Sequence, residues 1–448
     1  MQHKIIIPMR VQRRIDYQRP LQMLSLFLTI TLLVVSSGSS VFNSMFALSN
    51  ESSPSEEDSR CNSFNKPEKI ITIGCIGNTH LTDIHSKLQD RNILDRQPDG
   101  VWLLNAGMVI ERGSTLTVDS KDTKWLKIVA DGNNAYPITV LGSLKIDSVK
   151  VTSWNPQTNG YAISKGNRES NDALGKYDVT EGFPRPYLRI EEDASGNANI
   201  TNSEIAYLGY EAGIGEGKTG LTYLGGDNSV LRNNDIYNLY FAFYSKEVGG
   251  MIIENNHIHN NGHYGLDPHT RTHDMLIRNN SVHDNGSIGI VCSLDCSHIT
   301  IENNKAYSNA RIGIMLSRNM HDSIVRNNIV YNETQGIFVS KSHGNQIYNN
   351  TVSEVRNGIY LKNMSSGNNV HDNIIKSPIS SGIQVNTGAA GNTFYHNTIL
   401  DAPVHKAIVT DNDYFKATNT DPTVKAIDDT LQTRNTFNDN IVTAGRGM

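Results

Sequence analysis

From about residue 230 onward, apolar and polar residues alternate in short runs that recur at a fixed spacing. Two anchors mark the repeat: an Asn-Asn pair and a glycine followed by leucine or isoleucine. The second asparagine, or its equivalent, recurs every 22–24 residues, at Asn234, Asn256, Asn280, Asn304, Asn328, Asn350, Asn373 and Asn397. The glycines keep the same spacing, at Gly265, Gly289, Gly313, Gly336, Gly358 and Gly382. Self-similarity at this period is typical of a solenoid.

The alternation within each repeat predicts strands. Ile314 and Leu316 follow one glycine at a spacing of two, and Ile299 and Ile301 precede one Asn-Asn pair in the same way. A period of two favours strands over helices, which need a period near 3.6. The chain is therefore expected to be all-β, a parallel β-helix with about three strands per coil stacked ~4.8 Å apart. Asparagines at the turns are expected to adopt left-handed geometry and to stack their amides.

The repeat sets the expected domain boundaries. Residues 100–400 are predicted to form the solenoid, with longer and less regular coils before residue 155 and a surface loop over 156–186. Residues 61–99 are predicted to form an N-terminal cap, with a short helix over 82–90 that starts at Thr82 and covers the open end of the solenoid. Residues 401–448 lose the period and are expected to form a C-terminal cap.

The first 47 residues look like an export segment. Basic residues precede a 12-residue apolar stretch, 24–35, and small residues follow it, which is typical of a secretory signal. The alternative is an uncleaved membrane anchor from Leu21 to about Ala47. Residues 48–60 are acidic and serine-rich and are expected to be a linker. Both alternatives place the remainder outside the cytoplasm, so the protein is expected to be secreted, periplasmic or on the cell surface.

The four cysteines fit export. A bridge between Cys61 and Cys75 is the favoured pairing, and the spacing of Cys292 and Cys296 would suit a pair across a turn. The formal net charge of −5 argues against nucleic-acid binding. We expect a monomer with no cofactor and no metal site. Calcium would suit an enzyme that acts on an acidic polymer, but no Gly-Gly-x-Gly-x-Asp run is present to bind it.

One coil departs from the repeat in its chemistry. It reads Tyr264-Gly-Leu-Asp-Pro-His269, and Pro268 replaces an aliphatic core residue, which removes a hydrogen bond from the sheet. Such breaks are enriched at functional sites. On a strand of period two, Asp267 and His269 are expected to share one outward face. The alternative is an ordinary solvated turn in a chain that has 15 histidines.

Neighbouring coils are expected to bring further polar groups to this face. The segment before the unusual coil places Tyr244 and Lys246 outward, Arg271 follows at the next turn, and Arg318 comes two coils later. An acid, an imidazole, phenols and cations would then lie together.

The segment Tyr264-Gly-Leu-Asp-Pro-His269, set in an Asn/Gly coil repeat, resembles the mannuronan C5-epimerases of alginate biosynthesis. The resemblance covers roughly residues 200–400 and implies a right-handed, single-stranded parallel β-helix. It implies His269 as the catalytic base, Tyr264 as the partner acid or base and Asp267 as the motif acid. Two positions depart from the family pattern: an acid is replaced by Thr270, and the arginine of the following coil is replaced by Leu294.

This resemblance implies an enzyme that acts on an anionic polysaccharide. Removing the proton at C5 of a uronate needs a base, a cation or acid at the neighbouring carboxylate, and a proton donor on the opposite face of the ring. We expect His269 as base, Tyr264 as donor, Asp267 as orienter or carboxyl contact, and Lys246, Arg271, Arg318 and Tyr244 as substrate contacts. Strand parity alone would point Tyr264 inward unless the chain turns at Gly265.

Three alternatives remain open from the sequence. A polysaccharide lyase would use the same residues and eliminate the 4-linked group. A non-catalytic carbohydrate-binding solenoid would need no chemistry. A glycoside hydrolase would need a second carboxylate near Asp267, and the outward positions offer none.

Overall fold

The computed structural model describes residues 61–132, 136–163, 184–211, 217–386, 388–403, 406–410 and 435–444. The predicted export segment, the linker over 48–60 and most of the loop over 156–186 lie outside these residues. Among the described residues, no helix has both the length and the apolar character needed to cross a membrane.

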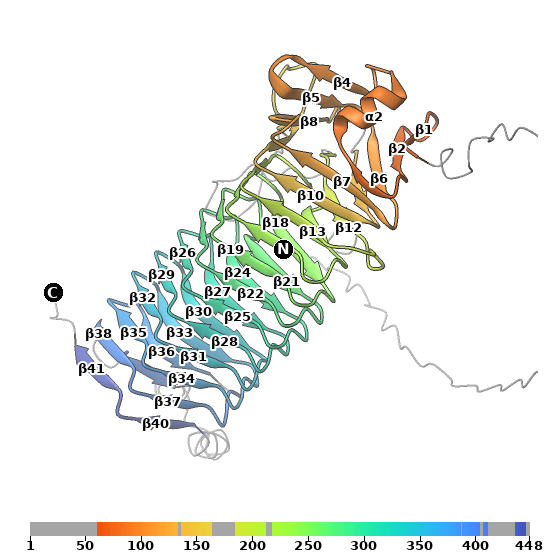
Figure 1. Ribbon diagram of the computed structural model, residues 1–448. Coiled ribbons are helices and arrows are strands. Elements are labelled where there is room, and N and C mark those ends of the chain that lie inside the picture. Colours follow the sequence, from red (N-terminus) through yellow and green to blue (C-terminus); the bar gives the residue numbers. More distant parts are fainter. Residues whose placement is uncertain are drawn as a thin grey trace, which may run out of the picture. The chain divides into compact units, whose positions relative to one another are not determined.

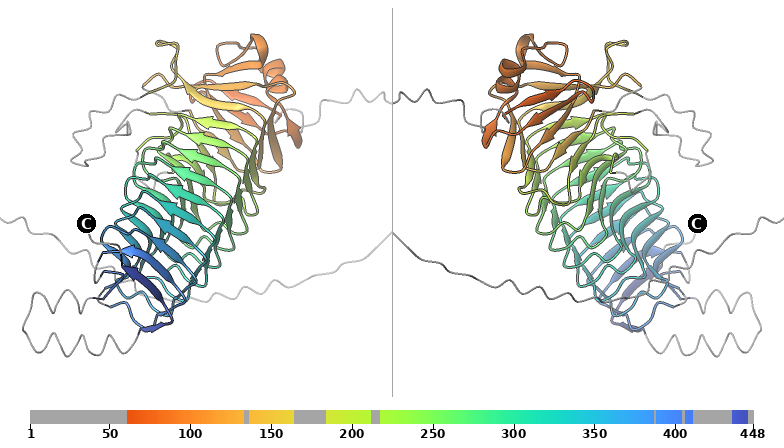
Figure 2. Two further views of the ribbon diagram at one scale, coloured as in Figure 1. Left: turned by 90° about the vertical axis from the view of Figure 1, so that its left-hand side faces the viewer. Right: turned by 90° about the vertical axis from the view of Figure 1, so that its right-hand side faces the viewer.

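The described chain winds into a solenoid of three sheets, whose strands stack along one axis (Figures 1 and 2). Successive strands of one coil enter sheets A, B and C in turn. Among the described strands, all pairings are parallel except β1 with β2 and β4 with β5. The period-two alternation predicted this architecture, and the prediction is confirmed.

Sheet A has 14 strands: β1 (Ser63–Asn65), β2 (Ile70–Ile73), β6 (Gly107–Ile110), β9 (Ile138–Val140), β12 (Leu188–Ile190), β15 (Gly220–Tyr223), β18 (Phe241–Lys246), β21 (Leu266–His269), β24 (Ile288–Ser293), β27 (Ile312–Ser317), β30 (Gln335–Ser340), β33 (Asn357–Lys362), β36 (Ser381–Val385) and β39 (Ile408–Thr410).

Sheet B has 13 strands: β3 (Gly77–Thr79), β7 (Ser114–Asp119), β10 (Ser143–Asp147), β13 (Ala198–Thr201), β16 (Val230–Arg232), β19 (Ile252–Glu254), β22 (Leu276–Arg278), β25 (Thr300–Glu302), β28 (Ile324–Arg326), β31 (Gln346–Tyr348), β34 (Asn369–His371), β37 (Thr393–Tyr395) and β40 (Thr436–Asn438).

Sheet C has 14 strands: β4 (Leu94–Gln97), β5 (Val101–Leu104), β8 (Trp125–Val129), β11 (Lys150–Trp154), β14 (Glu204–Ala206), β17 (Asp235–Tyr237), β20 (His257–His259), β23 (Ser281–His283), β26 (Lys305–Tyr307), β29 (Ile329–Tyr331), β32 (Thr351–Ser353), β35 (Ile374–Lys376), β38 (Thr398–Ala402) and β41 (Ile441–Ala444).

The Asn-Asn pair forms the turn between sheets B and C, and its two residues have different tasks. The first takes the left-handed conformation, as at Asn303 with φ of 56°, which asparagine tolerates well. The second is buried and forms a ladder along the axis. The Asn304 amide oxygen accepts from the backbone and side chain of Asn280, both at 2.9 Å. Its Nδ2 donates to the Ile277 carbonyl at 3.0 Å and to Asn328 at 3.1 Å. The predicted amide stack is therefore confirmed.

The recurring glycine has a packing reason. A Cβ at Gly265 would lie 2.6 Å from Cγ1 of Val282, a core residue, and 2.5 Å from the Gly289 carbonyl oxygen. Glycine and the residue after it therefore both face the interior, which breaks the alternation at this point. As a result, the residue before each glycine faces outward.

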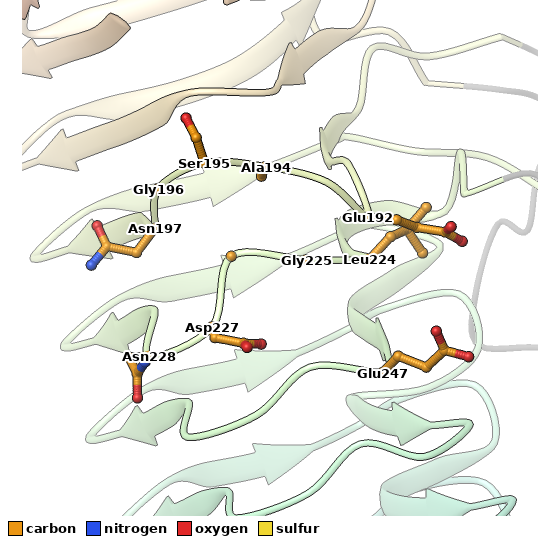
Figure 3. Close-up of a pocket in the computed structure, with 11 residues that line it drawn as sticks. Glu192, Ala194, Ser195, Gly196, Asn197, Leu224, Gly225, Asp227, Asn228 and Glu247 are labelled. Atoms are coloured by element: carbon orange, nitrogen blue, oxygen red, sulfur yellow. The ribbon is translucent and has the colours of Figure 1, made fainter. Parts of the chain in front are cut away.

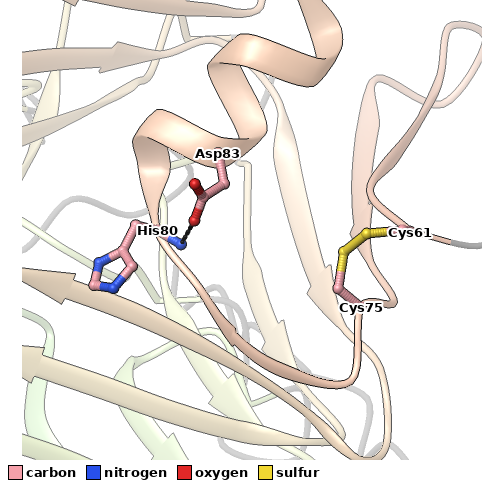
Figure 4. Close-up of a disulfide and its surroundings, with 4 residues drawn as sticks. All are labelled: Cys61, Cys75, His80 and Asp83. Atoms are coloured by element: carbon pink, nitrogen blue, oxygen red, sulfur yellow. Dashed lines mark hydrogen bonds between the residues drawn. A yellow bond between two sulfur atoms is a disulfide. The ribbon is translucent and has the colours of Figure 1, made fainter. Parts of the chain in front are cut away.

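The N-terminal cap contains the helix that the sequence predicted. Helix α2 spans Leu81–Leu88 and buries Leu81 and Ile84. It starts one residue before Thr82, because His80 is the cap residue: the Asp83 carboxylate accepts from the His80 backbone N–H at 2.8 Å. Nearby, Cys61 and Cys75 form the predicted disulfide (Figure 4). Cys292 and Cys296 are buried free thiols, so the pairing considered for them is wrong.

The predicted end of the solenoid at residue 400 needs correction. Strands β39, β40 and β41 extend sheets A, B and C beyond it, as far as Ala444. The period is lost in the sequence because residues 411–434 intervene between β39 and β40, whereas Asn392 and Asn397 still hydrogen-bond to Asn435 and Asn440.

A second buried ladder ends at an acid. Asn261, Asn285 and Asn309 pass amide hydrogen bonds from coil to coil, and Asn309 Nδ2 donates to Glu333 Oε1 at 2.7 Å. Glu333 is 5% exposed, and its Oε2 has no partner. Burial raises the pKa of Glu333 to about 8, although the bonds from Asn309 oppose this and the charge of Asp284 adds to it.

We expect Glu333→Gln to stabilise the protein at alkaline pH. The raised pKa means that the carboxyl group favours folding fully below its unfolded pKa near 4.5, and that this contribution is lost as pH rises through about 8. Each pKa unit corresponds to about 1.4 kcal/mol, so the variant should exceed the wild type by a few kcal/mol at pH 9. Thermal unfolding from pH 5 to 9 measures this, with the exposed Glu354→Gln as control. Equal pH slopes in wild type and Glu333→Gln would contradict it.

Candidate active site

The outward face of sheet A carries the predicted site, and strand β21 places His269 there. His269 is 9% exposed. Its Nε2 lies 2.9 Å from the Arg318 guanidinium, and its Nδ1 lies 2.7 Å from the Thr270 hydroxyl. Because a guanidinium can only donate, Nε2 is the acceptor and Nδ1 carries the proton. Burial lowers the pKa of His269 to about 4, and the charge of Arg318 adds to this effect. The imidazole is therefore neutral at neutral pH.

Arg318 reaches this imidazole across two coils. It follows strand β27, and the intervening coil has Leu294 in register. Its Nε donates to the Ser293 hydroxyl at 2.8 Å, which holds the side chain over β24, and its other end contacts His269. The loss of the expected arginine at position 294 is thus compensated in space by Arg318. Likewise, Thr270 contacts Nδ1 as an acid at that position would, but it adds no negative charge.

Asp267 is in register with Tyr244 and is almost completely buried, with 1% exposed. The predicted outward position therefore does not leave its carboxyl group exposed to solvent. Both of its carboxyl oxygens are without a hydrogen-bond partner, so it does not orient His269 by a hydrogen bond. Burial raises the pKa of Asp267 well above its ordinary value, and Arg318 opposes the shift.

Two tyrosines belong to the predicted site, and Tyr244 flanks the imidazole. The Tyr244 ring lies 5.5 Å from the His269 ring, centroid to centroid. Burial and the charge of Asp267 raise the pKa of Tyr244 to about 12. Tyr264 precedes Gly265 and so faces outward, stacked on His263 at 4.0 Å. Burial, with the charge of Asp267, also raises the pKa of Tyr264. Both phenols are therefore protonated at neutral pH.

The other two predicted cations are engaged by acids. Lys246 is in register with His269, but its Nζ lies 2.6 Å from Glu192. Arg271 forms an ion pair with Glu247. Of the three cations predicted for the site, only Arg318 contacts His269 in the described structure. Glu192 lies far upstream in the sequence, so no local pattern could have revealed its pairing.

An apolar row beside His269 was missed by the sequence analysis. It consists of outward residues on consecutive strands of sheet A, namely Ile288, Val291, Ile312 and Phe338, with Tyr264, Met315 and Tyr360 packed against them. A signal was present, because Val291, Met315, Phe338 and Tyr360 occupy outward positions where a solvated face would carry polar residues. The row extends the site along the solenoid axis.

A pocket of about 410 Å³ lies to one side, where the chain leaves sheet A (Figure 3). Its lining includes Glu192, Asp227 and Glu247, together with the backbone of Gly225 and Gly226. An acidic lining repels an anionic polymer, so this pocket does not extend the site towards such a substrate.

The chain matches known proteins of one fold class. Residues 189–332 match the family model described as "Right handed beta helix region", and residues 272–441 match "Periplasmic copper-binding protein (NosD)". The crystal structure of the periplasmic alginate epimerase AlgG superposes with a TM-score of 0.66 and 18% identity, covering 84% of each chain. The fold is therefore a right-handed parallel β-helix, as predicted.

The chain is also similar in sequence to curated proteins of known activity. The chain is 27% identical over 208 residues to a mannuronan C5-epimerase of Pseudomonas fluorescens, and 28% identical over 218 residues to the one of Pseudomonas aeruginosa. These matches cover 44% and 47% of this chain. The chain spans only about a third of the relatives' length, 36% in each case.

Proposed function

We propose that this protein is an exported mannuronan C5-epimerase, which abstracts the C5 proton of uronate residues in an anionic polysaccharide. The observation that carries the proposal is the neutral imidazole of His269, which accepts a hydrogen bond from the Arg318 guanidinium and lies on the same strand as the buried carboxyl group of Asp267. The similarity to curated mannuronan C5-epimerases supports the substrate class. We also propose a periplasmic location, in line with the predicted export segment.

Arg318 has two roles in the proposed reaction. Before substrate binds, its guanidinium occupies the Nε2 lone pair of His269, so the base is blocked. A uronate carboxylate is a better partner for a guanidinium than a neutral imidazole is. When the carboxylate binds Arg318, Nε2 is released beside the C5 proton. The same ion pair then neutralises the charge that develops as the proton leaves.

The remaining groups complete the proton transfers. His269 takes the C5 proton and becomes imidazolium, while Thr270 keeps the ring in place through Nδ1. Asp267 is 1% exposed, so its carboxyl group can reach the substrate carboxylate only if the side chains that cover it move when the polymer binds. Tyr264 returns a proton to C5 from the opposite face and inverts the centre. Solvent then takes the proton from His269 and restores the phenol, so the net reaction is isomerisation.

The apolar row gives the polymer a path along sheet A. Its aromatic and aliphatic side chains can pack on the apolar faces of sugar rings. Lys362 lies at the far part of the row, with Nζ 5.1 Å from the Phe338 ring centroid. It is placed to contact the carboxylate of a more distant sugar. We therefore propose that the chain binds several consecutive uronates.

The variant His269→Gln tests the proposal. Without the base, deuterium exchange at C5 of polymannuronate should fall by ~10²–10⁴-fold, as measured by proton NMR of the anomeric region in D₂O. His321→Gln serves as a matched control, because His321 is an outlying turn histidine paired with Asp322.

The same assay separates the alternatives. Formation of unsaturated ends, seen by absorbance, would identify a lyase instead of an epimerase. Undiminished exchange in His269→Gln would remove His269 from the mechanism. If the wild type binds the polymer but gives neither exchange nor unsaturation with polymannuronate or polygalacturonate, the protein is a binding solenoid and the enzymatic proposal fails.

A further inference from the structure

A cluster of three histidines and an aspartate lies on the outward face of sheet C, on a different sheet from the proposed active site. Its members are in register on three adjacent strands: Asp235 on β17, His257 and His259 on β20, and His283 on β23. On a strand of period two, the two histidines of β20 point to the same face. Asp235 Oδ1 lies 3.0 Å from His257 Nδ1 and 3.0 Å from His259 Nε2.

The hydrogen bonds around the cluster leave too few protons for neutral histidines. His283 Nδ1 faces the Asp284 carboxylate at 2.9 Å, so its proton is on Nδ1 and its Nε2 has a lone pair. This Nε2 lies 2.7 Å from His257 Nε2. If His257 donated from Nδ1 to Asp235, two lone pairs would face each other. His259 has a similar conflict, because its Nδ1 faces the Asn260 amide oxygen at 3.2 Å while its Nε2 faces Asp235.

A cation bound among the three donors removes both conflicts. His257 would bind it through Nδ1 and carry its proton on Nε2, which then donates to His283 Nε2. His259 would bind it through Nε2 and donate from Nδ1 to Asn260. The outer contacts to Asn260 and to the His283–Asp284 pair have the arrangement that normally orients metal-bound imidazoles.

We infer that Asp235 Oδ1, His257 Nδ1 and His259 Nε2 form a site for a divalent transition-metal ion of the zinc class, with His283 as an outer positioning residue. These three donor atoms all lie within 4.8 Å of one another. In a tetrahedral zinc site with bonds of ~2.1 Å, donors lie roughly 3.4 Å apart, so small side-chain shifts suffice. The side chains of Asp235 and His257 are about half exposed, at 46% and 50%, which leaves room for water to complete the shell.

The donor set suits a cation that competes with protons. Metal ligands must be deprotonated, so affinity should fall as pH is lowered.

Zinc titration of the tag-free chain, stripped with a chelator, tests the inference. Calorimetry at pH 7.5 should show one site with a Kd of about 10 µM or tighter. Asp235→Asn and His257→Asn should each weaken it at least ~10-fold, and His283→Asn by a smaller factor. Bound Co²⁺ should give the intense visible bands of four-coordination in the wild type and not in Asp235→Asn or His257→Asn.

The control is His80→Gln. His80, Asp119 and Asp122 form another group with suitable donors, but Asp122 already accepts from the Thr82 backbone and the Thr123 hydroxyl. His80→Gln should bind zinc like the wild type. Absence of stoichiometric binding, binding that survives in an Asp235→Asn, His257→Asn double variant, or binding lost in His80→Gln would each overturn the assignment. None of these outcomes depends on epimerase activity.

Discussion

Replacing Arg318 by alanine should reduce C5 exchange by ~10²–10³-fold, because the variant loses the cation that faces the developing carboxylate charge. Lysine should not restore the rate. The planar guanidinium contacts Ser293 and His269 at the same time, and a single ammonium group on a flexible stem cannot reproduce that fork. Deuterium incorporation at C5 under saturating polymannuronate measures the effect on kcat.

The pH profile of the same variant gives an independent readout. Removing a positive charge next to His269 should raise the pKa of the imidazole from about 4 towards its ordinary value. The acid limb of the residual rate should therefore move to higher pH. Arg326→Ala is the matched control, since Arg326 lies on sheet B in the same coil as Arg318 and pairs with Glu302. A wild-type rate in Arg318→Ala would assign the carboxylate contact to Lys246 or Arg271.

Replacing Asn304 by leucine should cause a large loss of stability. Leucine has a similar volume but removes the partner of the buried backbone N–H of Asn280 and the side-chain bond to the Ile277 carbonyl, and it interrupts the amide ladder on both sides. Each buried polar group that loses its partner costs roughly 1–3 kcal/mol. The summed effect should lower the melting temperature strongly in calorimetry.

The neighbouring position provides the control. Asn303→Gly keeps the left-handed turn, where Asn303 is exposed and has φ of 56°, and should stay close to the wild type. Because unfolding of a solenoid can be local, a limited protease assay near β25 should accompany calorimetry. An Asn304→Leu variant that melts and digests like Asn303→Gly would show that the ladder contributes little.

Much of the fold followed from periodicity, because stacked coils convert sequence spacing into spatial register. The alignment of Tyr244 with Asp267 and of Lys246 with His269 is of this kind. Parity failed at Tyr264, since glycine packing against Val282 adds an inward residue and reverses the alternation. Register also could not reveal side-chain conformation, which decides that Arg318 turns towards His269.

The sequence also could not predict contacts between site residues and residues that lie outside the regular repeat. Glu192 neutralises Lys246 from a position 54 residues upstream. The burial of Asp267 depends on what covers the strand, which periodicity does not describe. The His257–His259 alternation was visible in the sequence, but its significance depends on Asp235, which stacking brings alongside from the preceding coil.

The contact of Arg318 with His269 across the intervening coil also limits how the chain can change in length. Deleting the 24 residues of one repeat would preserve the core, the turns and the amide stack wherever the cut is made. Between β21 and β27, however, such a deletion would shift the Arg318 guanidinium by about 5 Å along the axis. Arg318 and His269 would then no longer lie at the distance that lets them contact each other. Beyond Lys362, repeats can be gained or lost during evolution without disturbing the residues around His269. The length of the surface that binds the polymer can therefore change independently of catalysis.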